Sequence, residues 1–191
     1  MFFLLFACAT SANAEITFNS VPWLANEETV SAALTNAGMK AEMITANESA
    51  IYLVANEALA YQPTTKPAYS EVCYAKEIPF AGKVAGFPIR KLILSYAYDG
   101  TMKLIAVKVD LIGADYETLR SKLTKVYGEG ETNRVDEEGI ESIIWKGEKN
   151  SGILLYTESE GYDYTFIYGR CDAEALLSDC LKPDPEDISG L

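Results

Sequence analysis

Carboxylates are the side chains of this sequence that could carry out acid–base chemistry, because the chain contains no histidine. Two carboxylates about 5 Å or about 6.5–9.5 Å apart can hydrolyse a glycosidic bond when one has a raised pKa in a cleft. The candidates crowd the second half of the chain and lie in expected turns and on expected strand faces: Glu137, Glu138, Glu141, Glu158, Glu160 and Asp163. A solvated acidic surface is the favoured interpretation, and an enzyme acting on a carbohydrate is the alternative.

Signatures of other reactions and of cofactors are absent from the sequence. The missing histidine excludes Ser-His-Asp and Cys-His catalysis and histidine-based zinc sites. The segment Gly128-Glu129-Gly130 lacks the further glycine and the lysine of a phosphate-binding loop. Acidic residues at 184, 186 and 187 could supply oxygen ligands to Ca²⁺, but their spacing is not that of an EF-hand. The sequence therefore predicts no cofactor and no metal site.

Three cysteines follow the N-terminal segment, at Cys73, Cys171 and Cys180. A short helix is expected over 172–179, and a continuous helix would hold Cys171 and Cys180 about 13 Å apart along its axis. A disulfide needs Cα atoms within about 7 Å. The sequence therefore favours a disulfide of Cys73 with either Cys171 or Cys180, while three reduced buried thiols are an equally good interpretation.

Aromatic side chains offer a candidate binding surface. Trp23 precedes the first expected helix, and Tyr162, Tyr164 and Tyr168 fall at even positions of one expected strand, where alternation places them on the same face. An exposed aromatic stripe is a kind of surface that supplies binding hot spots. Cross-strand packing of these rings in the core is the favoured alternative.

Two amphipathic helices and a set of strands are expected to position these groups. The segment 26–29 carries a capping residue and early acids, Gly38 would end that helix, and 115–118 and Gly128 bound a second helix in the same way. Asp99-Gly100 predicts a tight hairpin turn. Strands are expected over 41–55 (as a pair), 69–76, 90–98, 102–112, 141–145, 152–157 and 162–168, with loops over 79–88 and 129–138.

The expected elements indicate an α+β fold, an antiparallel sheet with helices on one face. Glu28-Thr29-Val30 and Leu34-Thr35 recur, at the same offset, as Glu117-Thr118-Leu119 and Leu123-Thr124. This recurrence indicates two tandem α-β-β-β units, over 18–108 and 109–181, within a single domain of residues 15–182. Two unrelated helices that share cap chemistry are the alternative, and residues 183–191 are expected to form a tail.

The first 14 residues are typical of an export signal. An uncharged apolar run, too short for the ~20 residues of a membrane span, is followed by Ala12 and Ala14, which suit signal-peptidase cleavage before Glu15. No Lys or Arg precedes Glu15, which indicates a leader truncated at its start. Cleavage is favoured over a lipoprotein anchored at Cys8 and over a buried element of a cytosolic protein. The sequence thus predicts an extracytoplasmic protein, periplasmic or secreted, without a membrane span.

The charge of the chain bears on its partners. Sixteen basic residues against 28 acidic ones give a net charge of −12. Such a chain repels phosphate backbones, so nucleic acid is not an expected partner. Solubility alone accounts for the acidity, and a basic protein patch would be attracted to it.

The order of a helix followed by a sheet, twice over, resembles the tandem plan of β-lactamase inhibitor proteins and small outer-membrane assembly lipoproteins. Separately, Phe18-Asn19-Ser20-Val21-Pro22-Trp23 is similar to the opening of secreted bacterial domains without an assigned activity. These resemblances imply export and a binding or accessory role, and they carry over no functional residue. The leading hypothesis is an exported, non-enzymatic protein of the bacterial cell envelope that recognises a protein partner in the envelope or medium. A structural envelope component is a further alternative.

Overall fold

A computed structural model describes residues 14–46, 69, 71–135, 141–157 and 164–181. For residues 133–135, 141, 156–157 and 164–167 it describes the backbone alone. No helix within these ranges is long and apolar enough to cross a membrane.

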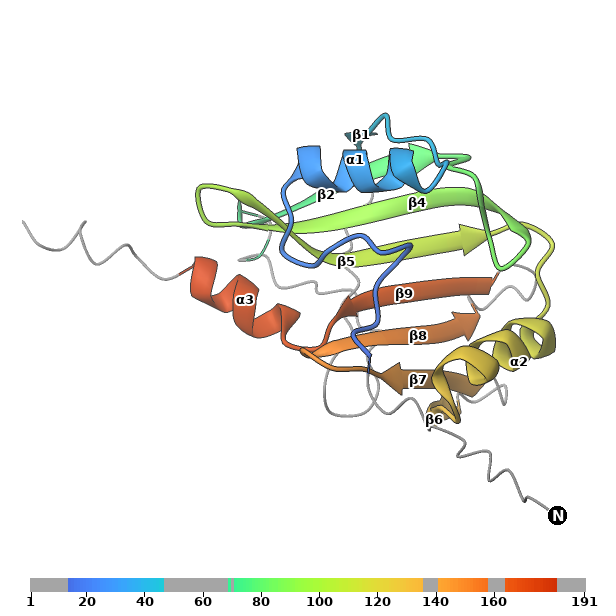
Figure 1. Ribbon diagram of the computed structural model, residues 1–191. Coiled ribbons are helices and arrows are strands. Elements are labelled where there is room, and N and C mark those ends of the chain that lie inside the picture. The colour runs from blue at the N-terminus through green and yellow to red at the C-terminus, as the bar shows by residue number, and fades with distance from the viewer. Residues whose placement is uncertain (1–13, 47–68, 70, 136–140, 158–163, 182–191) are drawn as a thin grey trace, which may run out of the picture.

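One antiparallel sheet forms the centre of the molecule (Figure 1). Its nine described strands follow the order β1-β2-β4-β5-β9-β8-β7-β6, with β3 paired to β4. The strands are β1 Ile44–Thr45, β2 Cys73–Pro79, β3 Lys83–Val84, β4 Phe87–Tyr98, β5 Met102–Leu111, β6 Glu131–Val135, β7 Glu141–Lys146, β8 Ser151–Thr157 and β9 Tyr164–Arg170. The helices are α1 Glu27–Asn36, α2 Tyr116–Tyr127 and α3 Ala173–Cys180. The predicted α+β class is confirmed.

Both expected amphipathic helices form where their caps predict. The Asn26 side chain accepts a hydrogen bond from the Thr29 N–H at 2.9 Å, and Asp115 accepts one from the Thr118 N–H at 2.8 Å. Gly128 follows α2 with a φ of 81°, a conformation that glycine adopts without strain. Each cap satisfies an N–H group that would otherwise lack a partner at the helix start.

The N-terminal cap of α1 gives a direct test of this account. Replacing Asn26 with alanine removes the acceptor for the Thr29 N–H, so we expect the free energy of unfolding to fall by about 1 kcal/mol. Chemical denaturation measures the change. Asn36→Ala, an exposed substitution at the other end of the same helix, is the matched control and should stay within about 0.5 kcal/mol of the wild type. Equal losses in the two variants would contradict a capping role.

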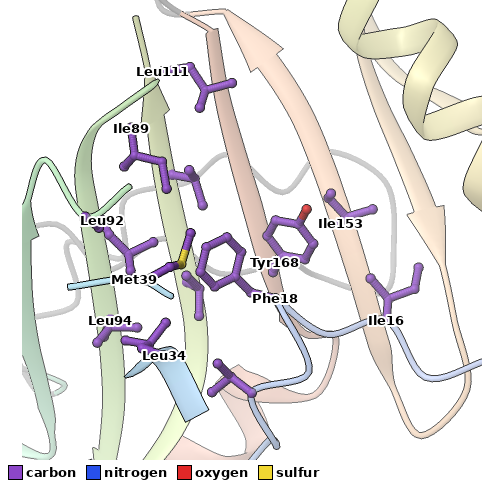
Figure 2. Packing of buried hydrophobic residues seen from close by; sticks show 14 of the residues in the cluster. Ile16, Phe18, Leu34, Met39, Ile89, Leu92, Leu94, Leu111, Ile153 and Tyr168 are labelled. Atoms are coloured by element: carbon purple, nitrogen blue, oxygen red, sulfur yellow. The ribbon is translucent and has the colours of Figure 1, made fainter. Parts of the chain in front are cut away.

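The main core lies between one face of the sheet and the layer formed by α1, α2 and the N-terminal segment. Figure 2 shows the rings of Phe18 and Tyr168 at its centre, edge to face with centroids 5.4 Å apart. The apolar side chains around them come from the N-terminal segment, from α1 and the loop after it, and from strands β4, β5 and β8. They are Ile16, Leu34, Met39, Ile89, Leu92, Leu94, Leu111 and Ile153. A long-range core of this kind requires both halves of the sheet to be in place.

The third helix packs differently from the other two. Its buried residues Ala173 and Leu177 belong to a second cluster with Cys73, Ala97 and Ile105. The residues directly before Ala97 and Ile105 are Tyr96 and Leu104, which belong to the main core. Side chains alternate between the two faces of a strand, so Ala97 and Ile105 point to the other face. Helix α3 therefore contacts the face of the sheet opposite α1 and α2.

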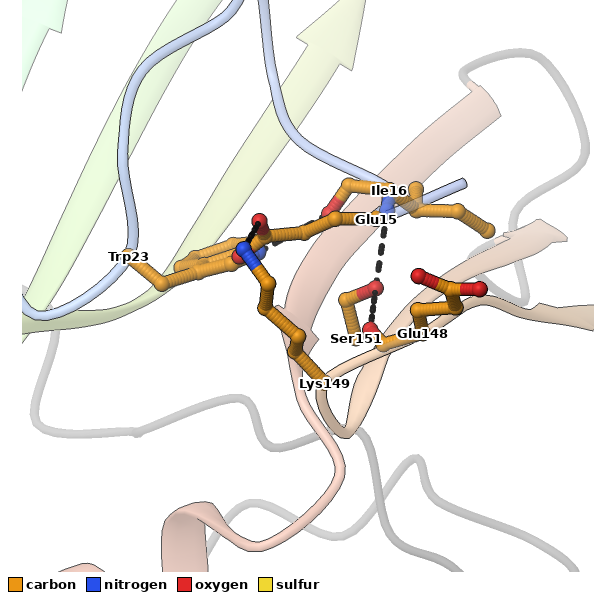
Figure 3. Close-up of polar contacts among 6 residues, drawn as sticks. All are labelled: Glu15, Ile16, Trp23, Glu148, Lys149 and Ser151. Atoms are coloured by element: carbon orange, nitrogen blue, oxygen red, sulfur yellow. Dashed lines mark hydrogen bonds and ion pairs between the residues drawn. The ribbon is translucent and has the colours of Figure 1, made fainter. Parts of the chain in front are cut away.

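The segment before α1 ties the two halves of the sheet together (Figure 3). The Ile16 N–H donates to Ser151 Oγ at 2.7 Å, and Ser151 Oγ donates to the Glu148 carbonyl at 2.6 Å. Further along, Leu24 and Ala25 exchange backbone hydrogen bonds with Leu104 in β5. The fold thus uses the chain directly after residue 14, while cleavage before Glu15 stays a prediction.

Two expected loops contain strands. Strand β6 lies in the segment 129–138 at the edge of the sheet, where Glu131 and Thr132 are exposed and no apolar alternation marks it. The segment 79–88 folds into a small hairpin, in which Lys83 and Val84 pair with Pro88 and Phe87. Of the strand pair expected over 41–55, β1 is described and 47–55 lie outside the described residues.

The two runs of strands meet at the centre of the sheet, where β5 pairs with β9. Each run follows its own helix, α1 before β1 to β5 and α2 before β6 to β9. The first of the two expected units ends at residue 108, but strand β5 continues to Leu111, three residues further. The duplication itself stays a prediction.

Candidate functional site

The expected aromatic site residues that the structure describes lie in the core. Trp23 is 8% exposed and Tyr168 is 6% exposed, and both belong to the main cluster. Tyr164 is described by its backbone alone, in β9, and Tyr162 lies outside the described residues. Trp23, in the segment before α1, and Tyr168, on β9, are therefore core residues, and Tyr168 also borders the pocket described below.

The expected acidic and metal-binding candidates fall largely outside the described residues. This applies to Glu137, Glu138, Glu158, Glu160, Asp163 and the tail acids at 184, 186 and 187, while Glu141 is described by its backbone alone. Within the described ranges, no three His, Cys, Asp or Glu side chains gather as metal ligands.

A pocket of about 330 Å³ lies between α2 and the β3 hairpin. This volume is at the lower end of the range for small-molecule pockets and suits one or two large apolar groups. Apolar side chains form most of the lining, which consists of Val84, Ala85, Leu119, Lys122, Leu123, Lys125, Val126, Tyr127 and Tyr168. The pocket is the candidate functional site.

The apolar stripe of α2 positions one wall of this pocket. Leu119, Leu123 and Val126 recur at i, i+4 and i+7 and so lie along one side of the helix. Leu119 and Leu123 are buried, whereas Val126 is 61% exposed. The stripe therefore begins as core and ends at the open rim of the pocket, where an apolar partner could cover Val126.

The opposite wall is the β3 hairpin. Ala85 adopts a φ of 51° and Gly86 a φ of 90°, which makes the tight reversal between Val84 and Phe87. A positive φ is unfavourable for a residue with a Cβ atom, so contacts with the surrounding structure must stabilise this conformation of Ala85. Here the turn brings Val84 and Ala85 to the pocket.

Two tyrosines, Tyr127 and Tyr168, contribute to the lining of the pocket. Burial raises the pKa of Tyr168, and the neighbouring Tyr127 raises it further. Burial likewise raises the pKa of Tyr127. Both phenols are therefore neutral at physiological pH and can donate or accept hydrogen bonds, but they are poor general bases.

The rim of the pocket is positively charged although the chain is strongly acidic. Lys122 and Lys125 are exposed and line the pocket, and its lining includes no acidic residue. Within the described part of the chain, neither lysine forms an ion pair. These ammonium groups are available to an anionic partner, because no acidic side chain of the described residues lines the pocket beside them.

The structure also reveals an exposed aromatic pair that lies outside the pocket lining. Tyr74 and Tyr98 stack edge to face with centroids 5.5 Å apart, and each is about two-fifths exposed, at 41% and 40%. Tyr74 lies on β2, and Tyr98 is the last residue of β4. It is a second exposed apolar surface on the described part of the chain.

Comparison of the chain with protein-family models, with curated proteins and with solved structures found no match in any of the three. Fold and site together define an α+β protein with one antiparallel sheet and an apolar, lysine-rimmed pocket. The resemblances to inhibitor-like and secreted bacterial domains stay predictions.

Proposed function

We propose that this chain is an exported, non-enzymatic binding or accessory protein of the cell envelope that recognises a protein partner at the pocket between α2 and β3. The observation that carries the proposal is an apolar recess with exposed lysines at its rim, on a chain of net charge −12. The partner segment presents an apolar side chain to Val126 and the recess and acidic residues to Lys122 and Lys125.

The chemistry of the lining supports binding more than catalysis. Among the described residues, no carboxylate and no thiol lines the pocket, and the two phenols in its lining have raised pKa values. Burial of one large apolar side chain contributes about 1.5–3 kcal/mol, and the acidic residues beside it set orientation and association rate. An anchor residue in a pocket, surrounded by charged contacts at the rim, is the common arrangement of a protein-binding hot spot.

Site-specific photocrosslinking tests the proposal in the producing cell. A benzophenone amino acid replaces Val126, and a second preparation carries it at Asn36, an exposed position on α1. After irradiation, mass spectrometry maps the crosslinked peptide. We expect a protein crosslink from position 126, absent from position 36, to a segment that combines acidic residues with a large apolar residue. A crosslink to a basic segment or to a lipid, or none at all, would refute the proposal.

Reversal of one rim charge should weaken binding of the partner recovered in this way. We expect Lys122→Glu to lower the affinity about tenfold at low ionic strength, because it replaces attraction to the acidic segment with repulsion. The difference should shrink as added salt screens the charges. Lys40→Glu, an exposed reversal on the loop after α1, is the matched control. Equal losses for the two variants would show that net charge alone, and not the pocket, governs binding.

A further inference from the structure

The second cluster, where α3 packs on the sheet, brings two of the three cysteines together. Cys73 opens β2 and pairs across the ladder with Ala97 of β4. Cys180 is the last residue of α3. The members of the cluster are Tyr69, Val72, Cys73, Ala97, Ile105, Ala173 and Leu177, with Leu176 and Cys180 half-buried against them.

The position of Cys180 on its helix directs the thiol toward the sheet. Ala173 and Leu177 are fully buried and mark the packed side of α3. Cys180 follows them by seven and three residues, spacings that return to the same side of a helix. Cys180 therefore shares the side of α3 that meets Cys73.

Packing places Cys180 against the cluster that contains Cys73, and the pKa of Cys73 responds to it. Burial, and to a lesser degree the charge that Cys180 carries when ionised, raise the pKa of the Cys73 thiol to about 12. Cys171 lies two residues before α3, which alone separates Ala173 from Cys180 by about 10 Å along its axis. A bridge between Cys171 and Cys180 would require that helix to break.

Polar contacts hold α3 in this position without a covalent bond. The Tyr69 hydroxyl and Ser178 Oγ share a hydrogen bond of 2.9 Å. At the start of the helix, the Arg170 guanidinium donates to both oxygens of Asp172, at 2.7 and 2.6 Å. The two thiols are not bonded in the structure, and these contacts keep α3 packed against the cluster that contains Cys73.

We propose that Cys73 and Cys180 form a disulfide that fastens α3 to the sheet, while Cys171 stays a thiol. The oxidant is a low-molecular-weight disulfide. The thiolate of Cys180, the less buried of the pair, attacks one sulfur of the oxidant and releases one thiol. The sulfur of Cys73 then displaces the remaining half as a second thiol. Two protons and two electrons pass from the cysteines to the oxidant.

The bond closes a loop from residue 73 to residue 180, more than half of the chain. Long loops lose the most conformational freedom in the unfolded state when they are closed, so the oxidised protein should be the more stable form. We expect its melting temperature to exceed that of the same protein after reduction by roughly 5–15 °C.

Thiol mapping tests the proposal. The full chain with Cys8→Ser, which leaves the three cysteines discussed here, is equilibrated with oxidised and reduced glutathione, alkylated and digested. We expect one linked peptide pair that contains Cys73 and Cys180, and an alkylated Cys171. Melting curves of the same preparation, with and without dithiothreitol, need no further variant and therefore do not depend on a mutant folding.

Two variants complete the test. Cys180→Ser should abolish the linked pair and the effect of dithiothreitol on the melting temperature, whereas Cys171→Ser should retain both. A bond between Cys73 and Cys171, a bond between two chains, or three alkylated thiols in the oxidised preparation would overturn the proposal.

Discussion

Replacing Trp23 with alanine is expected to lower the free energy of unfolding by about 3–5 kcal/mol, the range for deleting a large buried ring. Trp23 is 8% exposed, and its Nε1–H donates to the Ile16 carbonyl at 2.8 Å (Figure 3). The same Ile16 binds Ser151 in β8 through its N–H at 2.7 Å. Loss of the ring therefore both empties part of the core and releases the N-terminal segment from the second half of the sheet.

Urea denaturation measures this change, and Trp23→Phe separates its two causes. Phenylalanine keeps much of the buried ring but cannot donate to the Ile16 carbonyl, so a smaller loss of about 1–3 kcal/mol is expected. An alanine variant that loses less than 1 kcal/mol would show that Trp23 is not a core residue. Equal losses in the two variants would assign the whole effect to the hydrogen bond.

Val126→Asp is expected to weaken binding of the partner at least tenfold, or about 1.4 kcal/mol, without changing the fold. Val126 is 61% exposed at the pocket rim, and surface substitutions of this kind change stability by about 0.5 kcal/mol or less. The aspartate removes apolar contact area and repels the acidic partner segment. Binding should therefore fall while the melting temperature stays close to that of the wild type.

Ser121→Asp is the matched control for this prediction. Ser121 is exposed on the same helix and is not among the pocket-lining residues, so the variant adds the same charge away from the pocket. Titration calorimetry with the recovered partner compares the two variants. If Val126→Asp bound as tightly as the wild type, Val126 would lie outside the interface.

Local signals in the sequence predicted the elements that local chemistry determines. The caps at Asn26 and Asp115 located α1 and α2, and Asp99-Gly100 located the hairpin between β4 and β5. Strand β6 was not predicted because it lies at the sheet edge and its sequence is polar. Its position depends on pairing with β7, which no local pattern encodes.

The pocket was not predicted because it depends on tertiary contacts. The sequence pattern predicts that Val126 is a core residue of the apolar stripe of α2, whereas in the structure it is exposed. The pocket beside it forms because the β3 hairpin packs next to the helix, and the sequence does not show that contact. Lys108 and Asp110 give the reverse case. They interrupt an apolar strand and would be expected at the surface, yet both are buried and form an ion pair at 3.6 Å on β5.

Hydrogen–deuterium exchange of the chain, alone and bound to the partner recovered by crosslinking, tests the central claim most directly. The account predicts added protection in α2 from Leu119 to Val126 and in the β3 hairpin, with none in α1. Protection confined to the strands that carry Tyr74 and Tyr98, with α2 exchanging as before, would contradict the claim and move the binding site to the exposed aromatic pair.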